Sequence, residues 1–142
     1  MGKYNRTYHL PFSPGTSDDR ISKSVDSLLG IEVTITEKLD GENATLYNDY
    51  YHARSIDSKH HESRNWIKSF QANIAKDIPE GWRFCGEYLY AKHSISYENL
   101  ESYFYLFSIW NKNNDCLSWE DTIEISQILE IPTPKVLYKG VF

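Results

Sequence analysis

The sequence has few cysteines, no long apolar run and a deficit of positive charge. Its two cysteines, Cys85 and Cys116, lie far apart without CxxC spacing, which argues against a zinc site, and we expect both to be reduced and buried. No apolar run reaches the length of a membrane-spanning helix, and the N-terminal MGKYNRTYHL has no signal-peptide block. We therefore expect a cytoplasmic protein with no membrane partner.

Acidic residues outnumber basic ones. The formal net charge is −5, which excludes a general electrostatic attraction to nucleic acid, so such a partner would need a local basic patch. Hydrophobic residues make up 40% and aromatic residues 15% of the 142 residues, enough to build one core. We expect a single domain over residues 1–142 and a monomer.

The pattern of apolar residues predicts several strands. Ile31, Val33 and Ile35 alternate with polar residues, which predicts a half-buried strand that ends at Lys38. A hairpin packed beside that strand is predicted around Asn48-Asp49. The other predicted strand segments are residues 44–47, 51–55, 82–90 and 103–110.

Two helices are predicted between and after these strands. Apolar residues recur at helical spacing between residues 62 and 74, and Ser118 with Asp121 forms a capping-box signature before a second helix that ends before Pro132. The apolar positions are Trp66, Ile67, Phe70 and Ile74 in the first helix and Ile125, Ile128 and Leu129 in the second. The order of elements predicts an α+β fold with antiparallel β-sheets and flanking helices.

The segment EKLDGEN, residues 37–43, places one lysine between two acidic residues. A free lysine has a pKa of about 10.4, so only roughly one amine in a few thousand is unprotonated at neutral pH. A nucleophilic lysine therefore needs desolvation or a nearby cation, such as a metal ion. The alternative is that Lys38 is a solvated lysine at the end of a strand.

KLDGEN resembles the KxDG motif of the covalent nucleotidyltransferases, and the form KxDGxN is closest to the RNA ligases. Three later segments follow in that family's order: HARS at residues 52–55, Gly86-Glu87 within FCGEYLY, and YLFSI at residues 105–109. Over roughly residues 5–140 the chain is thus similar to RNA ligases of the type that seals nicks in duplex RNA. DNA ligases and capping enzymes share KxDG, but Asn43 and the match through residues 51–110 favour an RNA ligase.

The resemblance implies a nucleotidyltransferase (adenylation) domain that uses ATP with Mg²⁺ or Mn²⁺. Lys38 would be the nucleophile that forms lysyl-AMP. The AMP would pass to the 5′-phosphate of an RNA, and an RNA 3′-hydroxyl would then displace it. Gly41 would allow the turn after the strand.

The resemblance also implies roles for five further residues. Asn43 and Glu87 would hold the sugar of the nucleotide or reach the metal and phosphate through water, with Glu87 as the candidate metal ligand. Glu37 would bond the adenine amine, Phe107 would stack on the purine, and Arg54 would meet a phosphate. Without the resemblance, Glu87 reads as an exposed strand carboxylate, Phe107 as a core residue and Arg54 as a surface cation.

The sequence departs from the family at its C-terminal end. The EGxV and KxK motifs that follow in RNA ligases, and that help to hold metal and the α-phosphate, do not occur in this chain. The expected domain is thus incomplete at its C-terminal end. Two functions stay open: an ATP-dependent RNA ligase whose remaining motifs lie elsewhere, and a non-catalytic nucleotide- or RNA-binding remnant of a ligase.

Overall fold

The computed structural model of the protein describes residues 7–13, 21–53, 61–90 and 100–142. The chain divides into two compact units: Met1–Glu37 with Val136–Phe142, and Lys38–Lys135. Lys38 is therefore the first residue of the second unit. Within the described ranges, no helix combines the length and the hydrophobicity that crossing a bilayer requires.

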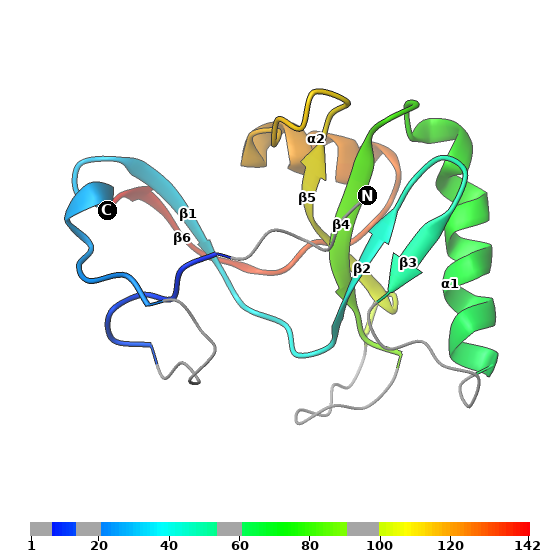
Figure 1. Ribbon diagram of the computed structural model, residues 1–142, viewed down its shortest axis with the longest axis horizontal. Coiled ribbons are helices and arrows are strands. Elements are labelled where there is room, and N and C mark those ends of the chain that lie inside the picture. Colours follow the sequence, from blue (N-terminus) through cyan, green and yellow to red (C-terminus); the bar gives the residue numbers. More distant parts are fainter. Residues whose placement is uncertain (1–6, 14–20, 54–60, 91–99) are drawn as a thin grey trace. The chain divides into compact units, whose positions relative to one another are not determined.

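The second unit is built on a four-stranded antiparallel sheet in the order β3-β2-β4-β5 (Figure 1). The strands are β2 (Glu42–Leu46), β3 (Tyr51–Ala53), β4 (Arg83–Tyr88) and β5 (Phe104–Trp110). They confirm the four strand segments predicted in this part of the chain, although residues 54 and 55 lie outside the described ranges.

The predicted hairpin is confirmed as β2 and β3. The N–H of Tyr47 donates to the carbonyl of Tyr50 at 2.8 Å and closes the turn over Asn48-Asp49. Its predicted partner strand was wrong, because β2 pairs with β4 and not with the strand that precedes Lys38. The reason is that alternate apolar residues of β2 and β4 share one buried face, whereas the earlier strand pairs with the end of the chain.

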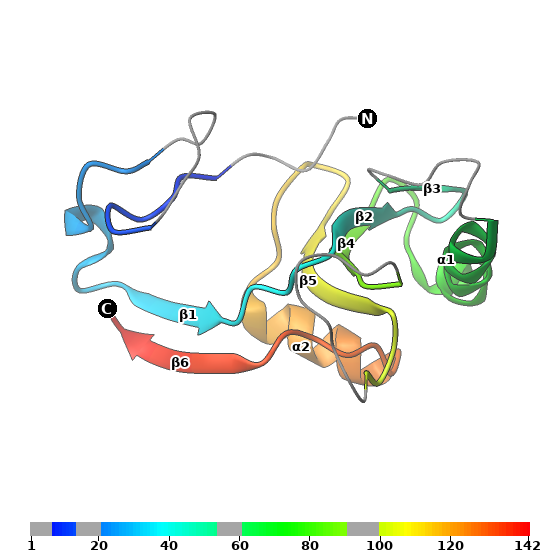
Figure 2. The ribbon, with the colours of Figure 1, turned by 90° about the horizontal axis from the view of Figure 1, so that it is seen from below.

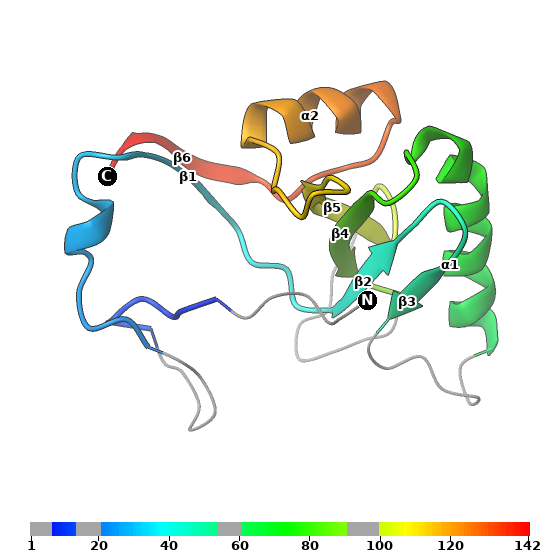
Figure 3. The ribbon, with the colours of Figure 1, turned by 45° about the horizontal axis from the view of Figure 1, so that its top comes forward.

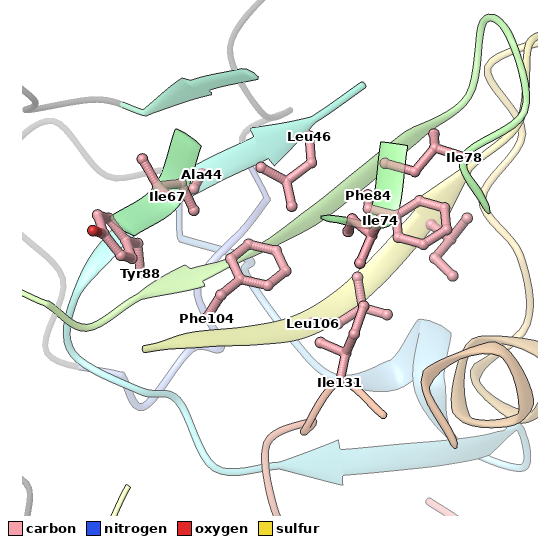
Figure 4. Close-up of a cluster of buried hydrophobic side chains, with 11 residues drawn as sticks. Ala44, Leu46, Ile67, Ile74, Ile78, Phe84, Tyr88, Phe104, Leu106 and Ile131 are labelled. Carbon is pink, nitrogen blue, oxygen red and sulfur yellow. The ribbon is translucent and has the colours of Figure 1, made fainter. Parts of the chain in front are cut away.

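Helix α1 (His61–Ile74) covers one face of this sheet and buries the main core. Ile67 and Ile74 of the helix meet Leu46, Phe84 and Phe104 of the strands (Figure 4). Burying an apolar side chain of this size stabilises the fold by about 1.5–3 kcal/mol. The helical spacing thus correctly predicted both the helix and the face that it buries. A short 3₁₀ turn, η2 (Ala75–Asp77), follows α1.

Helix α2 (Trp119–Ile128) packs beside β5 (Figure 3). The hydroxyl of Ser118 accepts from the N–H of Asp121 at 3.1 Å, which confirms the predicted N-cap. The predicted apolar face was wrong at Ile128, which is 71% exposed. The buried stripe runs through Thr122 instead, and Ile128 falls outside it.

The first unit contains β1 (Glu32–Thr36) and β6 (Val136–Val141), which pair antiparallel as a two-stranded sheet (Figure 2). A 3₁₀ turn, η1 (Asp26–Leu28), precedes β1 in the chain. The strand before Lys38 is thus confirmed, but β6 was not predicted. The expected half-burial was wrong for Ile31 and Ile35, which are 52% and 41% exposed. Alternation predicts which side chains share a face, and it does not predict what covers that face.

Candidate functional site

The four-stranded sheet turns polar side chains onto the face opposite α1. In the register of β2 and β4, Asn43 pairs with Glu87 and Thr45 pairs with Cys85. Because neighbouring residues of a strand point to opposite faces, these four side chains lie on the face away from the core residues Ala44 and Phe84. Glu87 in turn stands beside Tyr105 of β5. The sequence-predicted residues Asn43 and Glu87 are therefore neighbours, although 44 positions separate them in the chain.

The turn that contains Lys38 is attached to this face. Lys38 is exposed, whereas Leu39 is 7% exposed and belongs to the buried residues. The N–H of Gly41 donates to the Oε2 atom of Glu87 at 3.0 Å. The structure therefore brings the KLDG segment and the Gly86-Glu87 segment together.

Gly41 is needed for close packing rather than for an unusual turn. Its φ is not positive; the glycines with positive φ among the described residues are Gly30, Gly81 and Gly140. A Cβ at position 41 would lie 2.4 Å from the carbonyl oxygen of Tyr88. The expectation that Gly41 serves a turn conformation is corrected accordingly: only a residue without a side chain can approach β4 this closely.

Phe107 lies on the polar face, at a β-bulge of β5. Leu106 pairs with Gly86 and Ser108 pairs with Cys85, so Phe107 is the extra residue between them. Leu106 belongs to the core, and alternation from it turns Phe107 away from α1. Phe107 is half-buried on the same face as Glu87, which disfavours the alternative that it is a core residue.

Further residues of this face were not predicted as site residues. The rings of Tyr47 and Tyr50 stack with centroids 4.5 Å apart, and His52 is close to both. Burial raises the pKa of Tyr47 to about 12 and lowers the pKa of His52. The alternation of residues along the predicted strands could have placed Tyr47 and His52 on this face. Nothing in their residue types indicated a specific chemistry.

The two cysteines differ in their surroundings. Cys85 is buried on the polar face, where the hydroxyl of Thr45 is 3.8 Å from its Sγ atom, and burial raises the pKa of its thiol. Cys116 is exposed, which corrects the expectation that both cysteines are buried. Both are free thiols, as expected.

Two predicted residues are not placed at this face. Glu37 is half-buried and belongs to the first unit, whose N-terminal segment Met1–Glu37 ends immediately before Lys38. Arg54 lies outside the described residues. The role of Glu87 as a metal ligand stays a prediction; in the described ranges, no three His, Cys, Asp or Glu side chains gather as a metal cluster.

The sequence profile of the RNA ligase family matches residues 31–142, which include all the site residues placed above. The chain belongs to the RNA ligase family. No curated protein sequence matches the chain.

Solved RNA ligases share the fold. A lysine-to-alanine mutant of Naegleria gruberi RNA ligase, solved with ATP and Mn, matches with a TM-score of 0.63 and 16% identity, over 81% of this chain and 38% of that chain. The apo form of an aspartate-to-alanine mutant of the same ligase matches with a TM-score of 0.64 at equal identity and coverage. The likeness confirms the predicted α+β fold with antiparallel sheets. This chain spans 38% of the length of these ligases.

Proposed function

We propose that the chain carries the nucleotide site of an ATP-dependent RNA ligase, with Lys38 as the residue that accepts AMP. The contact between Gly41 and Glu87 is the observation that carries this proposal. It joins the lysine turn to a sheet face on which Asn43 and Phe107 also lie. Membership of the RNA ligase family supports the same reading.

The chemistry is three successive phosphoryl-type transfers. In the first, the Nζ atom of Lys38 attacks the α-phosphorus of ATP, a P–N bond forms, the bond to pyrophosphate breaks and the amine releases its proton. In the second, an oxygen of an RNA 5′-phosphate attacks the same phosphorus and frees the lysine. In the third, an RNA 3′-hydroxyl attacks the 5′-phosphorus, loses its proton, and AMP leaves. Positioning and charge neutralisation supply most of the catalysis in such steps.

The residues of this chain would bind and orient the nucleotide. Asn43 and Glu87 hold its sugar, because both are polar and adjacent at the start of β2 and the end of β4. Phe107 stacks on the purine, and a half-buried ring turned away from the core is suited to this. Glu37 bonds the adenine amine and Arg54 meets a phosphate, in keeping with the family resemblance.

A divalent cation fits this site as a companion of the nucleotide. Mg²⁺ usually binds through one or two carboxylates together with substrate phosphates, so the single carboxylate of Glu87 is compatible with it. When bound, the cation neutralises charge on the phosphates. The surrounding residues of the chain would orient the nucleotide and set the position of the lysine.

A sealing assay tests the proposal. The chain is incubated with ATP, Mg²⁺ and RNA that has 5′-phosphate and 3′-hydroxyl ends, and the products are separated by gel electrophoresis. We expect a joined RNA from the wild type and from Lys112→Ala, whose lysine is exposed in a loop remote in sequence, and none from Lys38→Ala. RNA that already carries AMP at its 5′ end should bypass Lys38, because the first two transfers are complete.

The alternative function is nucleotide or RNA binding without turnover. It predicts that calorimetry detects ATP binding while every sealing reaction stays blank, including the reaction with pre-adenylated RNA. The chain's coverage of 38% of the matching ligases is the observation that keeps this function in view.

A further inference from the structure

A hydrogen bond joins the lysine turn to the neighbouring strand β4. The backbone N–H of Gly41 donates to Oε2 of Glu87 at 3.0 Å, across 46 positions of sequence. The acceptor is a carboxylate, and hydrogen bonds to ionised groups are about twice as strong as those between neutral groups. The bond is partly buried, so water competes for it less than at an open surface.

Packing holds the same turn from two other sides. The backbone of Gly41 lies so close to the Tyr88 carbonyl that a Cβ there would clash at 2.4 Å. Leu39, one residue after the lysine, is buried. The turn is thus fixed at positions 39 and 41, while Lys38 itself is exposed at its start.

We infer that Glu87 is a positioning residue for Lys38: its carboxylate holds the turn through Gly41, in addition to any contact with the nucleotide. A carboxylate has two oxygens and about four lone-pair sites, so it can accept a bond from Gly41 together with other hydrogen bonds. One side chain would therefore link the place where the sugar binds to the place from which the lysine attacks.

The two roles of Glu87 have different kinetic consequences; this step rests on the proposed function. A residue that only bound the sugar would change the affinity for ATP. A residue that also sets the turn would change the rate of lysine adenylation at saturating ATP, because a misplacement of about 1 Å can cost about 10²-fold. Loss of the Glu87 carboxylate should therefore lower kcat for adenylation more than it raises KM.

The test itself needs no nucleotide. Amide hydrogen exchange of Gly41 is measured by NMR in the wild type, in Glu87→Met, which has similar length but no acceptor oxygen, and in Glu87→Gln, which keeps one. Glu124→Met, on an exposed face of α2, is the matched control. We expect exchange at Gly41 to accelerate at least about tenfold in Glu87→Met, from loss of a hydrogen bond to a charged group, and by less than half of that factor in Glu87→Gln.

Three results decide the inference. Exchange at Gly41 in Glu87→Met that equals the wild-type rate would overturn it. An acceleration shared equally by the amide of Thr45, in the middle of β2, would also overturn it, because Glu87 would then support the sheet and not the turn. An acceleration confined to Gly41 and largely restored by glutamine would establish it.

These outcomes are separable from those of the sealing assay. If Lys38 is adenylated while the exchange rate of the Gly41 amide is the same in Glu87→Met as in the wild type, the proposed function stands and the positioning role falls. If exchange of the Gly41 amide accelerates in Glu87→Met while no adenylate ever forms, the positioning role stands and the proposed function falls.

Discussion

The two faces of the four-stranded sheet are built from alternate residues of the same strands, yet they differ in chemistry. On β4, Phe84 and Tyr88 pack under α1, whereas Glu87 points to the opposite face and accepts a hydrogen bond from the lysine turn. Because the side-chain period of a strand is two, neighbouring positions can serve stability and binding separately. Substitutions close together in sequence should therefore have unlike effects.

The largest effect on stability should come from Phe104 of β5, and Phe107 of the same strand is its contrast. Phe104 is fully buried, so Phe104→Ala should lower the free energy of unfolding by about 3–5 kcal/mol. Phe107 is half-buried on the other face, and Phe107→Ala should cost no more than about 2 kcal/mol. Urea unfolding measures both values, and calorimetry with ATP should show weaker binding in Phe107→Ala. Equal losses of stability would contradict the division between the faces.

A smaller loss is expected where a glycine lies under a ring of the core face. A Cβ at Gly86 would lie 2.4 Å from the Tyr105 carbonyl and 2.5 Å from the ring of Phe104. Gly86→Ala should therefore lower the free energy of unfolding by about 1–3 kcal/mol through overpacking. Thermal unfolding of the purified variant checks this, and a midpoint equal to that of the wild type would show that the strands can separate at no cost.

The polar face should make stability depend on pH through His52. In the described part of the chain its Nε2 atom is buried without a hydrogen-bond partner, and burial lowers the pKa of the imidazole. The unfolded chain, with a histidine pKa of about 6.5, then binds more protons than the folded chain, so stability falls as the pH drops below that value. The urea midpoint should fall less between pH 7.5 and pH 5.5 in His52→Gln than in the wild type. Identical falls would refute this role.

The smallest effect on stability is expected at Lys38, the residue proposed to accept AMP. Lys38 is exposed, so Lys38→Ala should change the free energy of unfolding by no more than about 0.5 kcal/mol. Urea unfolding checks this value, with Leu39→Ala as the matched contrast because Leu39 is buried next to it. A large loss in Lys38→Ala would mean that the lysine supports the fold.

The parts of the fold that sequence reasoning predicted are the local ones. The β2–β3 hairpin, α1 and the Ser118 cap each depend on residues within a few positions of one another, so periodicity and turn chemistry were sufficient. The pairing of β1 with β6 joins opposite ends of the chain, and no local pattern indicated it.

For the candidate site, resemblance supplied the residues and the structure supplied their arrangement. Residue types predicted neither the bulge at Phe107 nor the close approach of Gly41 to Tyr88, because both depend on the register between distant strands. The Gly41–Glu87 bond likewise depends on that register. The roles of Glu37 and Arg54 stay predictions.

The most direct test of the central claim is the intact mass of the chain after incubation with ATP and Mg²⁺, followed by peptide mapping. We predict an added adenylate on the wild type and on Lys112→Ala, located on the peptide that contains Lys38, and none on Lys38→Ala. An adenylate on a different residue, or an equal adduct on Lys38→Ala, would contradict it.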